Sequence, residues 1–246
     1  MVNMEVCANS VRSALAAQEG GAIRVELCDN LQEGGTTPSH AQIALAKKLL
    51  SIKVYPIIRP RGGDFLYSDL EFSIMKDDIK VCKSLNCDGV VIGILTADGS
   101  VDQERCAELI KIAKPMGVTF HRAFDMTNDL EKALEVIIDL GCERVLTSGG
   151  EATALQGAGR LASLITQANC RIVIMPGSGI SIANISDIIG TTGAKEFHAS
   201  AKQPVNSEMQ FKNARLSMGT GTDEFTFEVT DSKTVKNLIE LANSAE

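Results

Sequence analysis

The amino-acid sequence lacks the long hydrophobic run that a membrane-spanning protein needs. No stretch of its 246 residues approaches the roughly 18 consecutive apolar residues that cross a bilayer. The segment from Met1 to Glu5 has neither a basic start nor a long apolar run, so we expect no signal peptide and a cytoplasmic location. Tryptophan is absent, yet hydrophobic residues make up 44% of the chain, which is enough for a substantial core.

Positive charge is also scarce, because the net charge is −7 and the sequence pI is near 5.1. Nonspecific nucleic-acid binding needs a basic surface, so we expect no nucleic-acid partner. The seven cysteines include no Cys-x-x-Cys pair, which argues against a zinc ribbon or a thioredoxin-like motif. Most of these thiols are therefore expected to be free and buried in a reducing compartment.

What the chain does contain is a repeated order of short apolar strand, polar loop and amphipathic helix. Strands are expected at residues 4–7, 24–27, 54–58, 89–92, 118–120, 144–146, 171–175 and 196–198. Helices are expected at about residues 10–18, 39–50, 70–85, 102–114, 129–140, 159–168, 183–189 and 231–245. This order predicts an α/β fold in which helical crossovers join parallel strands.

Eight such units in a chain of this length are typical of a single-domain (β/α)8 TIM-type barrel, here spanning residues 1–246. The polar segment 203–222 breaks the pattern and is expected to be a long loop or arm. An open, doubly wound sheet is the alternative. No Gly-x-Gly-x-x-Gly sequence follows the first strand, however, which weakens a dinucleotide-binding interpretation.

Three loops after predicted strands carry unusual residues, and they span 59–64, 121–125 and 176–180. The loops that leave the carboxyl ends of barrel strands meet at one rim, where active sites are built. Two basic loops and one glycine-rich loop are therefore expected to converge on a single cavity.

Cys7 and Cys28 each stand two residues after a glutamate at the end of a predicted strand. Because side chains alternate along a strand, Glu5 shares a face with Cys7, and Glu26 shares one with Cys28. The two strands are expected to be neighbours, so the two thiols would lie close together at the rim. Two soft thiolates suit Cu(I) as a metal site. The alternative is a pair of small buried cysteines.

The two glutamates would point into the barrel, where a buried carboxylate needs a cationic partner or hydrogen bonds. Arg59 and Arg61 flank a proline at the same rim. A guanidinium matches a carboxylate or phosphate with two parallel hydrogen bonds, so both arginines are expected to bind a ligand. The alternative, that they only neutralise Glu5 and Glu26, stays open, and a mixed role is expected.

His121, Arg122 and Asp125 follow the predicted strand 118–120. A carboxylate near an imidazole can fix its tautomer and raise its basicity, which acid–base catalysis requires. We therefore expect His121, Asp125 and Glu26 as candidate catalytic residues and Arg122 as a ligand-binding residue.

The remaining candidates bind ligand at the ends of later strands. Ser148 follows strand 144–146, while His198 and Ser200 lie at the end of the last strand. The glycine-rich turn contributes Gly177, Ser178 and Gly179 and precedes a short helix, as phosphate-binding loops of barrels often do. The alternative is a tight turn whose dihedral angles need glycine.

At this point the motifs resemble a known family, the CutC family, named for copper homeostasis. The resemblance covers about residues 3–202 and rests on Glu5-Val6-Cys7, Arg24-Val25-Glu26-Leu27-Cys28, Glu33-Gly34-Gly35-Thr36-Thr37-Pro38, Arg59-Pro60-Arg61-Gly62-Gly63-Asp64-Phe65-Leu66-Tyr67-Ser68, Thr119-Phe120-His121-Arg122-Ala123-Phe124-Asp125, Arg144-Val145-Leu146-Thr147-Ser148-Gly149 and Glu196-Phe197-His198-Ala199-Ser200-Ala201. One departure is that Gly177-Ser178-Gly179 stands where a run of three glycines is common.

The resemblance implies an α/β barrel, a cytoplasmic location, a homodimer and Cu(I) binding, carried here onto Cys7 and Cys28. It brings no established reaction. Two hypotheses follow. In the first, the protein is a copper-homeostasis factor. In the second, it is an enzyme of unknown reaction that holds a small anionic or phosphorylated substrate with Arg61, Arg122 and the loop around Gly177.

Overall fold

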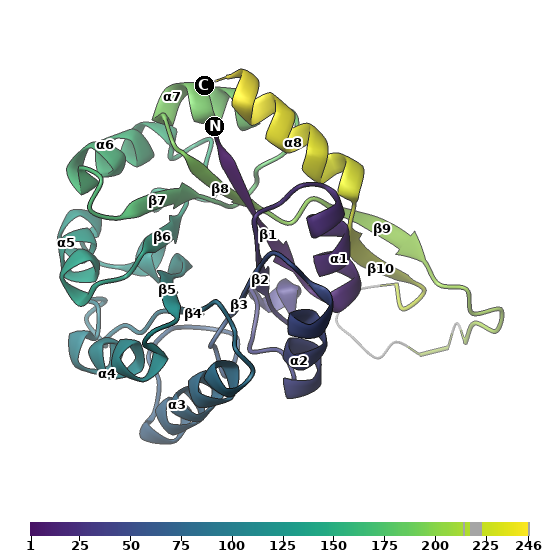
Figure 1. Cartoon of the computed structure of the whole chain (residues 1–246), viewed down its shortest axis with the longest axis horizontal. Helices are drawn as coiled ribbons and strands as arrows, with labels where there is room; N and C mark the ends of the chain where they lie inside the picture. Colours follow the sequence, from purple (N-terminus) through teal and green to yellow (C-terminus); the bar gives the residue numbers. More distant parts are fainter. Residues whose placement is uncertain (214, 217–222, 246) are drawn as a thin grey trace.

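The computed structural model describes residues 1–213, 215–216 and 223–245. Parallel strands form a ring at the centre of the molecule, and helices surround it (Figure 1). The strands of the ring are β1 (Asn3–Ala8), β2 (Arg24–Leu27), β3 (Lys53–Pro56), β4 (Gly89–Ile92), β5 (Gly117–Phe120), β6 (Arg144–Thr147), β7 (Val173–Pro176) and β8 (Glu196–Ala199). The predicted single-domain (β/α)8 barrel is confirmed.

The ring closes from two arcs of four strands, with orders β3-β2-β1-β8 and β4-β5-β6-β7. A parallel bridge between Ile57 and Val91 joins the arcs just beyond β3, where the amide of Ile58 donates to the carbonyl of Val91 at 2.8 Å. On the other side β7 lies beside β8 (Figure 1). Because all eight strands are parallel, their carboxyl ends and the loops that follow share one end of the barrel.

The surrounding helices are α1 (Val11–Glu19), α2 (His40–Leu49), α3 (Asp69–Ser84), α4 (Gln103–Ala113), α5 (Leu130–Leu140), α6 (Ala158–Ala168), α7 (Ile185–Thr192) and α8 (Ser232–Ser244). Local sequence sets their ends. Ser10 caps α1 through the amide of Ser13, and Ser68 with Glu71 forms a capping box at α3. Gly141, at φ 83°, ends α5 in the left-handed region that favours glycine.

The strands separate an apolar outer layer from a polar interior. Val6, Val25 and Val54 are fully buried in the main hydrophobic cluster between strands and helices. Their neighbours Glu5 and Cys7 take the opposite face of β1 because side chains alternate along a strand. The barrel interior therefore holds titratable groups that the apolar layer shields from solvent.

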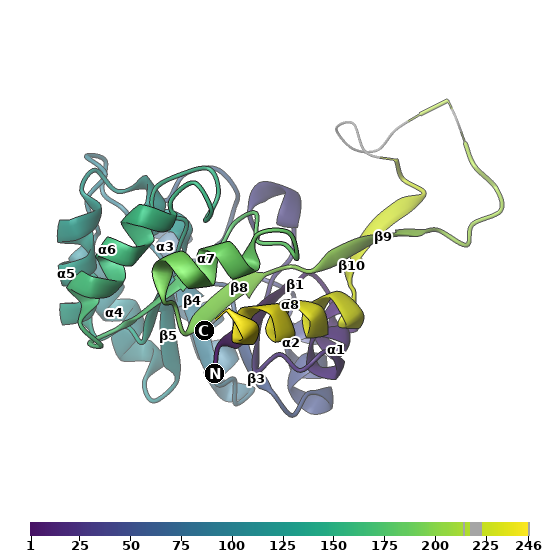
Figure 2. The same ribbon diagram turned by 90° about the horizontal axis from the view of Figure 1, so that it is seen from above.

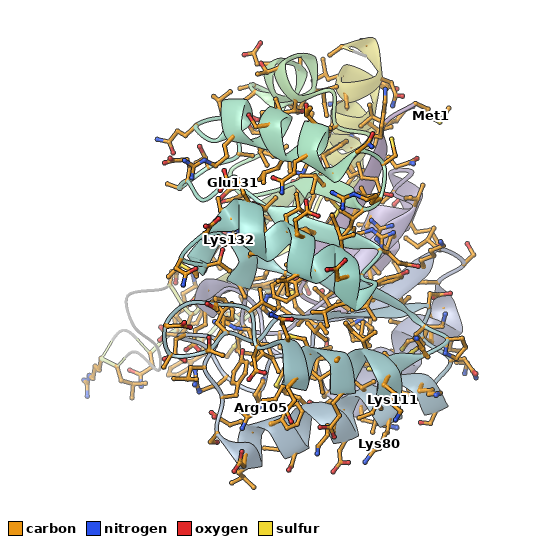
Figure 3. All side chains as sticks on the ribbon, turned by 90° about the vertical axis from the view of Figure 1, so that its left-hand side faces the viewer. Met1, Lys80, Arg105, Lys111, Glu131 and Lys132 are labelled. Carbon is orange, nitrogen blue, oxygen red and sulfur yellow. The ribbon has the colours of Figure 1, made fainter. Side chains whose placement is uncertain are left out.

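The outer helical surface is charged. Figure 3 shows Lys80 on α3, Lys111 on α4 and Lys132 on α5 pointing away from the barrel, and all three residues are exposed. Within the described part of the chain, no helix combines the length and apolar character that a bilayer crossing needs.

One insertion departs from the regular barrel. Strand β9 (Lys202–Asn206) pairs antiparallel with β10 (Thr226–Thr230) before α8, and this hairpin extends away from the barrel (Figure 2). The segment 203–222, expected as a loop or arm, thus begins inside a strand, and its residues 214 and 217–222 lie outside the described residues. Two short 3-10 helices in the rim loops, Leu31–Glu33 and Arg122–Met126, were not expected from the sequence either.

Candidate functional site

A cavity of about 740 Å³ opens among the loops at the carboxyl end of the barrel. Most residues predicted from the sequence line it, and they come from six of the eight strand ends. The predicted residues that line it are Cys7, Glu26, Arg59, His121, Arg122, Asp125, Ser178, Gly179, His198 and Ser200. The lining does not include the other four, which are Cys28, Arg61, Ser148 and Gly177.

Apolar side chains form much of the remaining wall. Ile57 and Leu146 contribute from the region of the strand ends, and Phe65 and Ile180 contribute from two loops. Leu238 reaches the cavity from α8, which is far away in the sequence. These residues could not be predicted from the sequence, because an apolar residue near a strand end has the same sequence pattern whether its side chain faces a helix or a cavity.

The two cysteines meet as expected at the junction of β1 and β2. The Sγ atoms of Cys7 and Cys28 lie 3.5 Å apart, and both residues are buried. Cys7 lies directly opposite Glu26 in the strand register. Sγ of Cys7, a carboxylate oxygen of Glu26 and a ring nitrogen of His198 all lie within 4.8 Å of one another.

This cluster offers sulfur, nitrogen and oxygen donors to one point in the cavity wall. Sulfur is the donor that selects Cu(I), and imidazole also binds copper. The sulfur of Cys7 and the imidazole of His198 therefore fit a soft metal ion, while Glu26 adds one hard ligand beside them. Cys28 lies outside this cluster, with its Sγ 3.5 Å from that of Cys7.

Glu5 lies directly beneath the cluster and holds His198 in place. Its Oε1 lies 2.8 Å from Nδ1 of His198, and its other oxygen accepts from Nε of Arg24. Burial opposes ionisation of Glu5, but the charges of Arg24 and His198 outweigh burial and lower the pKa of this carboxyl to about 2. Glu5 is therefore an ionised carboxylate.

The pKa values of the other groups in the cluster are raised, whereas that of Glu5 is lowered. Burial works against the charged imidazole of His198, but Cys7, Glu5 and Glu26 raise its pKa well above the usual range. The neighbouring sulfur of Cys28, followed by burial, raises the pKa of Cys7. Burial raises the pKa of Glu26. These directions favour the protonated forms of the Cys7 thiol and of the His198 imidazole.

The cationic partner of Glu5 is Arg24 and not one of the rim arginines, as the sequence suggested, while Glu26 lies 3.6 Å from Nε2 of His198. The Arg24 side chain is 1% exposed and also binds Glu196. Arg144 donates to the same Glu196 oxygen at 3.2 Å, so the lower barrel holds a continuous chain of paired charges. Arg24 stands two residues before Glu26, so strand alternation alone could have placed it inside the barrel.

Arg59 and Arg61 have different surroundings although they are two residues apart. Arg59 is 4% exposed, and its terminal nitrogens donate to the carbonyls of Glu33, Gly35 and Gly63. It fastens two rim loops together beside the cavity.

Arg61 points away from the cavity lining. It donates to Glu71 at 2.6 Å and to Asp64 at 2.9 Å. Its guanidinium also lies 5.1 Å from the ring centroid of Tyr67. The structure therefore separates Arg61 from Arg122, with which we expected it to hold one anion.

His121 is 3% exposed, and its Nδ1 accepts a hydrogen bond from the amide of Ala123. Its Nε2 is buried without a hydrogen-bond partner. Burial, with a contribution from Arg59, lowers the pKa of His121 to about 3, so the imidazole is neutral. A neutral imidazole that accepts at Nδ1 carries its proton on Nε2. His121 is therefore a poor base and a competent hydrogen-bond donor.

Asp125 does not orient His121, which corrects the expected pairing. Its carboxylate accepts from Nε of Arg122 at 2.8 Å and from the amides of Ser148 and Gly150. Arg122 also donates to Oγ of Ser148 at 2.9 Å. Asp125 and Ser148 therefore hold Arg122 at the cavity edge, and Ser148 supports the site without lining it.

The glycine-rich turn after β7 lines the cavity through Ser178 and Gly179. Ser178, at φ 80°, and Gly179, at φ 68°, both occupy the left-handed region. A Cβ on Gly177 would approach Cδ1 of Leu146 to 2.4 Å, so a larger residue there requires the Leu146 side chain to shift. Helix α7 begins at Ile185, and its N-cap residue Asn184 donates from Nδ2 to the carbonyl of Gly179 at 2.8 Å, so the start of the helix is joined to this turn.

Fold and site together define a class: a (β/α)8 barrel with a rim cavity whose wall includes a cysteine, a buried histidine and a glutamate. The sequence model of the CutC family matches residues 2–203 of this chain. A family protein CutC of Chromobacterium violaceum is 51% identical over 243 residues, covering 98% of each chain. The human copper homeostasis protein cutC homolog is 49% identical, covering 98% of this chain and 89% of its own. The chain belongs to the CutC family.

Solved structures agree with the fold. The crystal structure of the CutC protein from Streptococcus agalactiae superposes with a TM-score of 0.78 at 36% identity, covering 81% of this chain and 99% of that one. Phosphoribosyl anthranilate isomerase from Thermotoga maritima superposes with a TM-score of 0.60 at 14% identity, covering 99% of this chain and all of that one. At that identity the likeness shows the barrel fold alone.

Proposed function

We propose that this protein takes part in copper homeostasis by binding Cu(I) through Cys7 and Cys28. The observation that carries the proposal is the 3.5 Å separation of the two Sγ atoms beside the rim cavity. Two thiolates at one point form a soft site, which favours Cu(I) over hard cations. The names of the human and mouse relatives, which refer to copper homeostasis, support the same conclusion.

His198 is the adjacent nitrogen donor of this proposed site. Its Nδ1 is held by Glu5, so its Nε2 faces the side of Glu26 at 3.6 Å. A hydrogen bond at the far ring nitrogen fixes the orientation of a ligating histidine. Copper would enter here as cargo and would replace protons on the donors.

The test is a Cu(I) titration against a competing chelator under anaerobic conditions. Cys7→Ser and Cys28→Ser should each lower Cu(I) affinity by roughly 100-fold, because each removes one of two soft donors. Cys82→Ser and Cys106→Ser are matched controls, since both are buried cysteines on helices α3 and α4. Equal affinity in all four variants would remove the proposed site.

A second candidate function is supported by the size of the cavity and by Arg122 at its edge. About 740 Å³ is the volume of a small-molecule site, more than a metal ion needs. In this candidate the protein is an enzyme acting on a small anionic or phosphorylated substrate that Arg122 and the turn Ser178–Gly179 hold. Since His121 is neutral, Glu26, whose pKa burial raises, is the better group for proton transfer.

This candidate predicts that inorganic phosphate raises the melting temperature by binding the folded state. Arg122→Met should abolish the rise. Arg61→Met should keep it, because Arg61 lies outside the cavity lining. A wild-type protein that shows no phosphate-dependent rise would argue against the candidate.

The cytoplasmic location and the homodimer implied by the resemblance belong to the same proposal. Sedimentation equilibrium tests the dimer, and a mass of one chain, 26.2 kDa, at micromolar concentration would contradict it.

A further inference from the structure

We propose that Arg59 and His121 form a subsite for one anionic or carbonyl oxygen of a small organic ligand, and that Phe65 covers this subsite when no ligand is bound. The inference deepens the second candidate function by naming the chemical group that its cavity recognises. It uses none of the proposed copper donors.

Three buried side-chain polar atoms in the described residues have no hydrogen-bond partner. They are Nε of Arg59, Oη of Tyr67 and Nε2 of His121. Buried polar groups are almost always paired, and an unpaired one carries an energetic cost. Arg59 and His121 both line the cavity, whereas Tyr67 does not line it and lies beside the Arg59 side chain. A missing partner in the cavity therefore concerns Arg59 and His121.

The chemistry of these atoms defines the missing partner. Three of the five guanidinium N–H groups of Arg59 donate to loop carbonyls, which leaves its Nε–H and one N–H of Nη2. His121 accepts at Nδ1 and therefore donates at Nε2. These free groups are all donors, and those of Arg59 belong to a cation. The complement is a hydrogen-bond acceptor, preferably a negatively charged one.

The number of available donors limits the ligand further. The two terminal nitrogens of Arg59 already hold loop carbonyls, so they do not form a free fork for a carboxylate or phosphate. The buried nitrogens without a partner are Nε of Arg59 and Nε2 of His121. Two such donors suit one oxygen, as in sites that stabilise a polarised carbonyl or an oxyanion. A carboxylate or carbonyl oxygen fits this arrangement.

Phe65 lies against both donors. Its ring centroid is 5.0 Å from that of His121 and 5.1 Å from the guanidinium carbon of Arg59. All three side chains line the cavity, and Phe65 is half-buried. The two donor atoms are shielded from solvent. A ligand oxygen therefore reaches them only when the Phe65 ring moves aside, as a half-buried loop side chain can.

The experiment uses the full chain, with acetate as the carboxylate probe and acetamide as the neutral carbonyl probe. Proton–nitrogen spectra of protein with 15N-labelled histidine report Nε2–H of His121, and melting temperature is recorded in parallel. We expect a saturable shift of the Nε2–H resonance and a saturable rise in melting temperature with acetate. Acetamide should act more weakly, because it lacks the charge that Arg59 favours.

Variants locate the effect. His121→Phe should weaken acetate binding at least tenfold, since it removes one of two donors. Phe65→Ala should strengthen it severalfold, because the cover is gone. Leu66→Ala is the matched control: Leu66 is the adjacent residue, is 48% exposed and should leave acetate binding unchanged. If His121→Phe does not fold, the response of the wild-type Nε2–H resonance to acetate and the acetate affinity of Phe65→Ala still test the subsite.

Several outcomes would overturn the subsite. These are an Nε2–H resonance that responds to neither probe, and an acetate effect of equal size in wild type and His121→Phe. A buried water that bridges Arg59 and His121, in a protein that does not respond to acetate, would show that water and not a ligand is the missing partner. Phosphate separates the two claims: a phosphate response that Arg122→Met abolishes, in a protein that shows no response to acetate, would leave the second candidate function standing without this subsite.

Discussion

The two ends of the barrel interior bury similar residues in opposite ways. In the amino-terminal half, Arg24 is bound to two carboxylates and Arg144 to a third. At the carboxyl end, Arg59 and His121 are equally buried, but each keeps a donor without a partner. Buried charge that is fully paired stabilises one structure, whereas buried donors without partners mark a place where a ligand belongs.

An aromatic ring lies against the buried arginines in one half and covers the donors in the other. Tyr55 packs on both Arg24 and Arg144, with each guanidinium carbon 5.4 Å from its ring centroid, and its hydroxyl donates to Glu143 at 3.0 Å. Phe65 has no polar group to fix it in this way. The lower half is therefore a locked network, and the upper half has a cover that can move.

The largest effect should come from opening the locked network. Arg24→Met leaves Glu5 and Glu196 without their shared cation, and breaking a buried pair costs on the order of 3–5 kcal/mol. Urea denaturation measures the loss in free energy of unfolding. Arg171→Met is the control, because the pair of Arg171 with Glu135 is solvent-exposed and should contribute about 1 kcal/mol or less. Equal losses in both variants would show that the lower network is not locked.

The unpaired half should respond to pH. Burial, with a smaller contribution from Arg59, lowers the pKa of His121 from 6.5 to about 3. Between these two pH values the imidazole is protonated in the unfolded chain but neutral in the folded protein. The free energy of unfolding therefore falls as pH drops through the window from 6.5 to 3, by about 1.4 kcal/mol per pH unit. By pH 4.5 the loss is about 3 kcal/mol, within a factor of two.

Two other groups bear on that window. The pKa of Glu5, lowered to about 2 despite burial, makes its own stabilisation disappear only below pH 4.5. The pKa of Glu26, raised by burial, opposes the His121 effect by favouring the folded state at acid pH. The difference between wild type and His121→Phe isolates the imidazole. A difference that stays constant from pH 7 to 4.5 would mean that His121 is not buried as a neutral group.

The sequence predicts the barrel well because each strand carries its own signal. The bounds of β2 and β4 match the expected ranges, since β4 is a short apolar run and β2 alternates charged and apolar residues between clear loops. The hairpin β9–β10 is missed because β9 is exposed and polar, although the alternation of polar and apolar residues in β10 could have identified that strand.

The candidate site is predicted in part, and the errors have one cause. Strand alternation places Cys7 beside Cys28 correctly. Loop side chains follow no such periodicity, so Arg59 and Arg61 look equivalent in the sequence although only Arg59 lines the cavity. The pairing of Asp125 with Arg122 in place of His121 likewise depends on the 3-10 turn after β5, which spacing does not show.

The smallest effect should come from Arg61, and it tests where the boundary of the cavity lies. Its side chain is 38% exposed, and its hydrogen bonds join Glu71 and Asp64 at the surface. Arg61→Met should therefore cost under about 1 kcal/mol in urea denaturation, as exposed ion pairs usually do. It should leave the acetate, phosphate and Cu(I) titrations as in wild type. A phosphate response that disappears in this variant would place Arg61 at the anion site, and the cavity would then extend over the whole loop after β3.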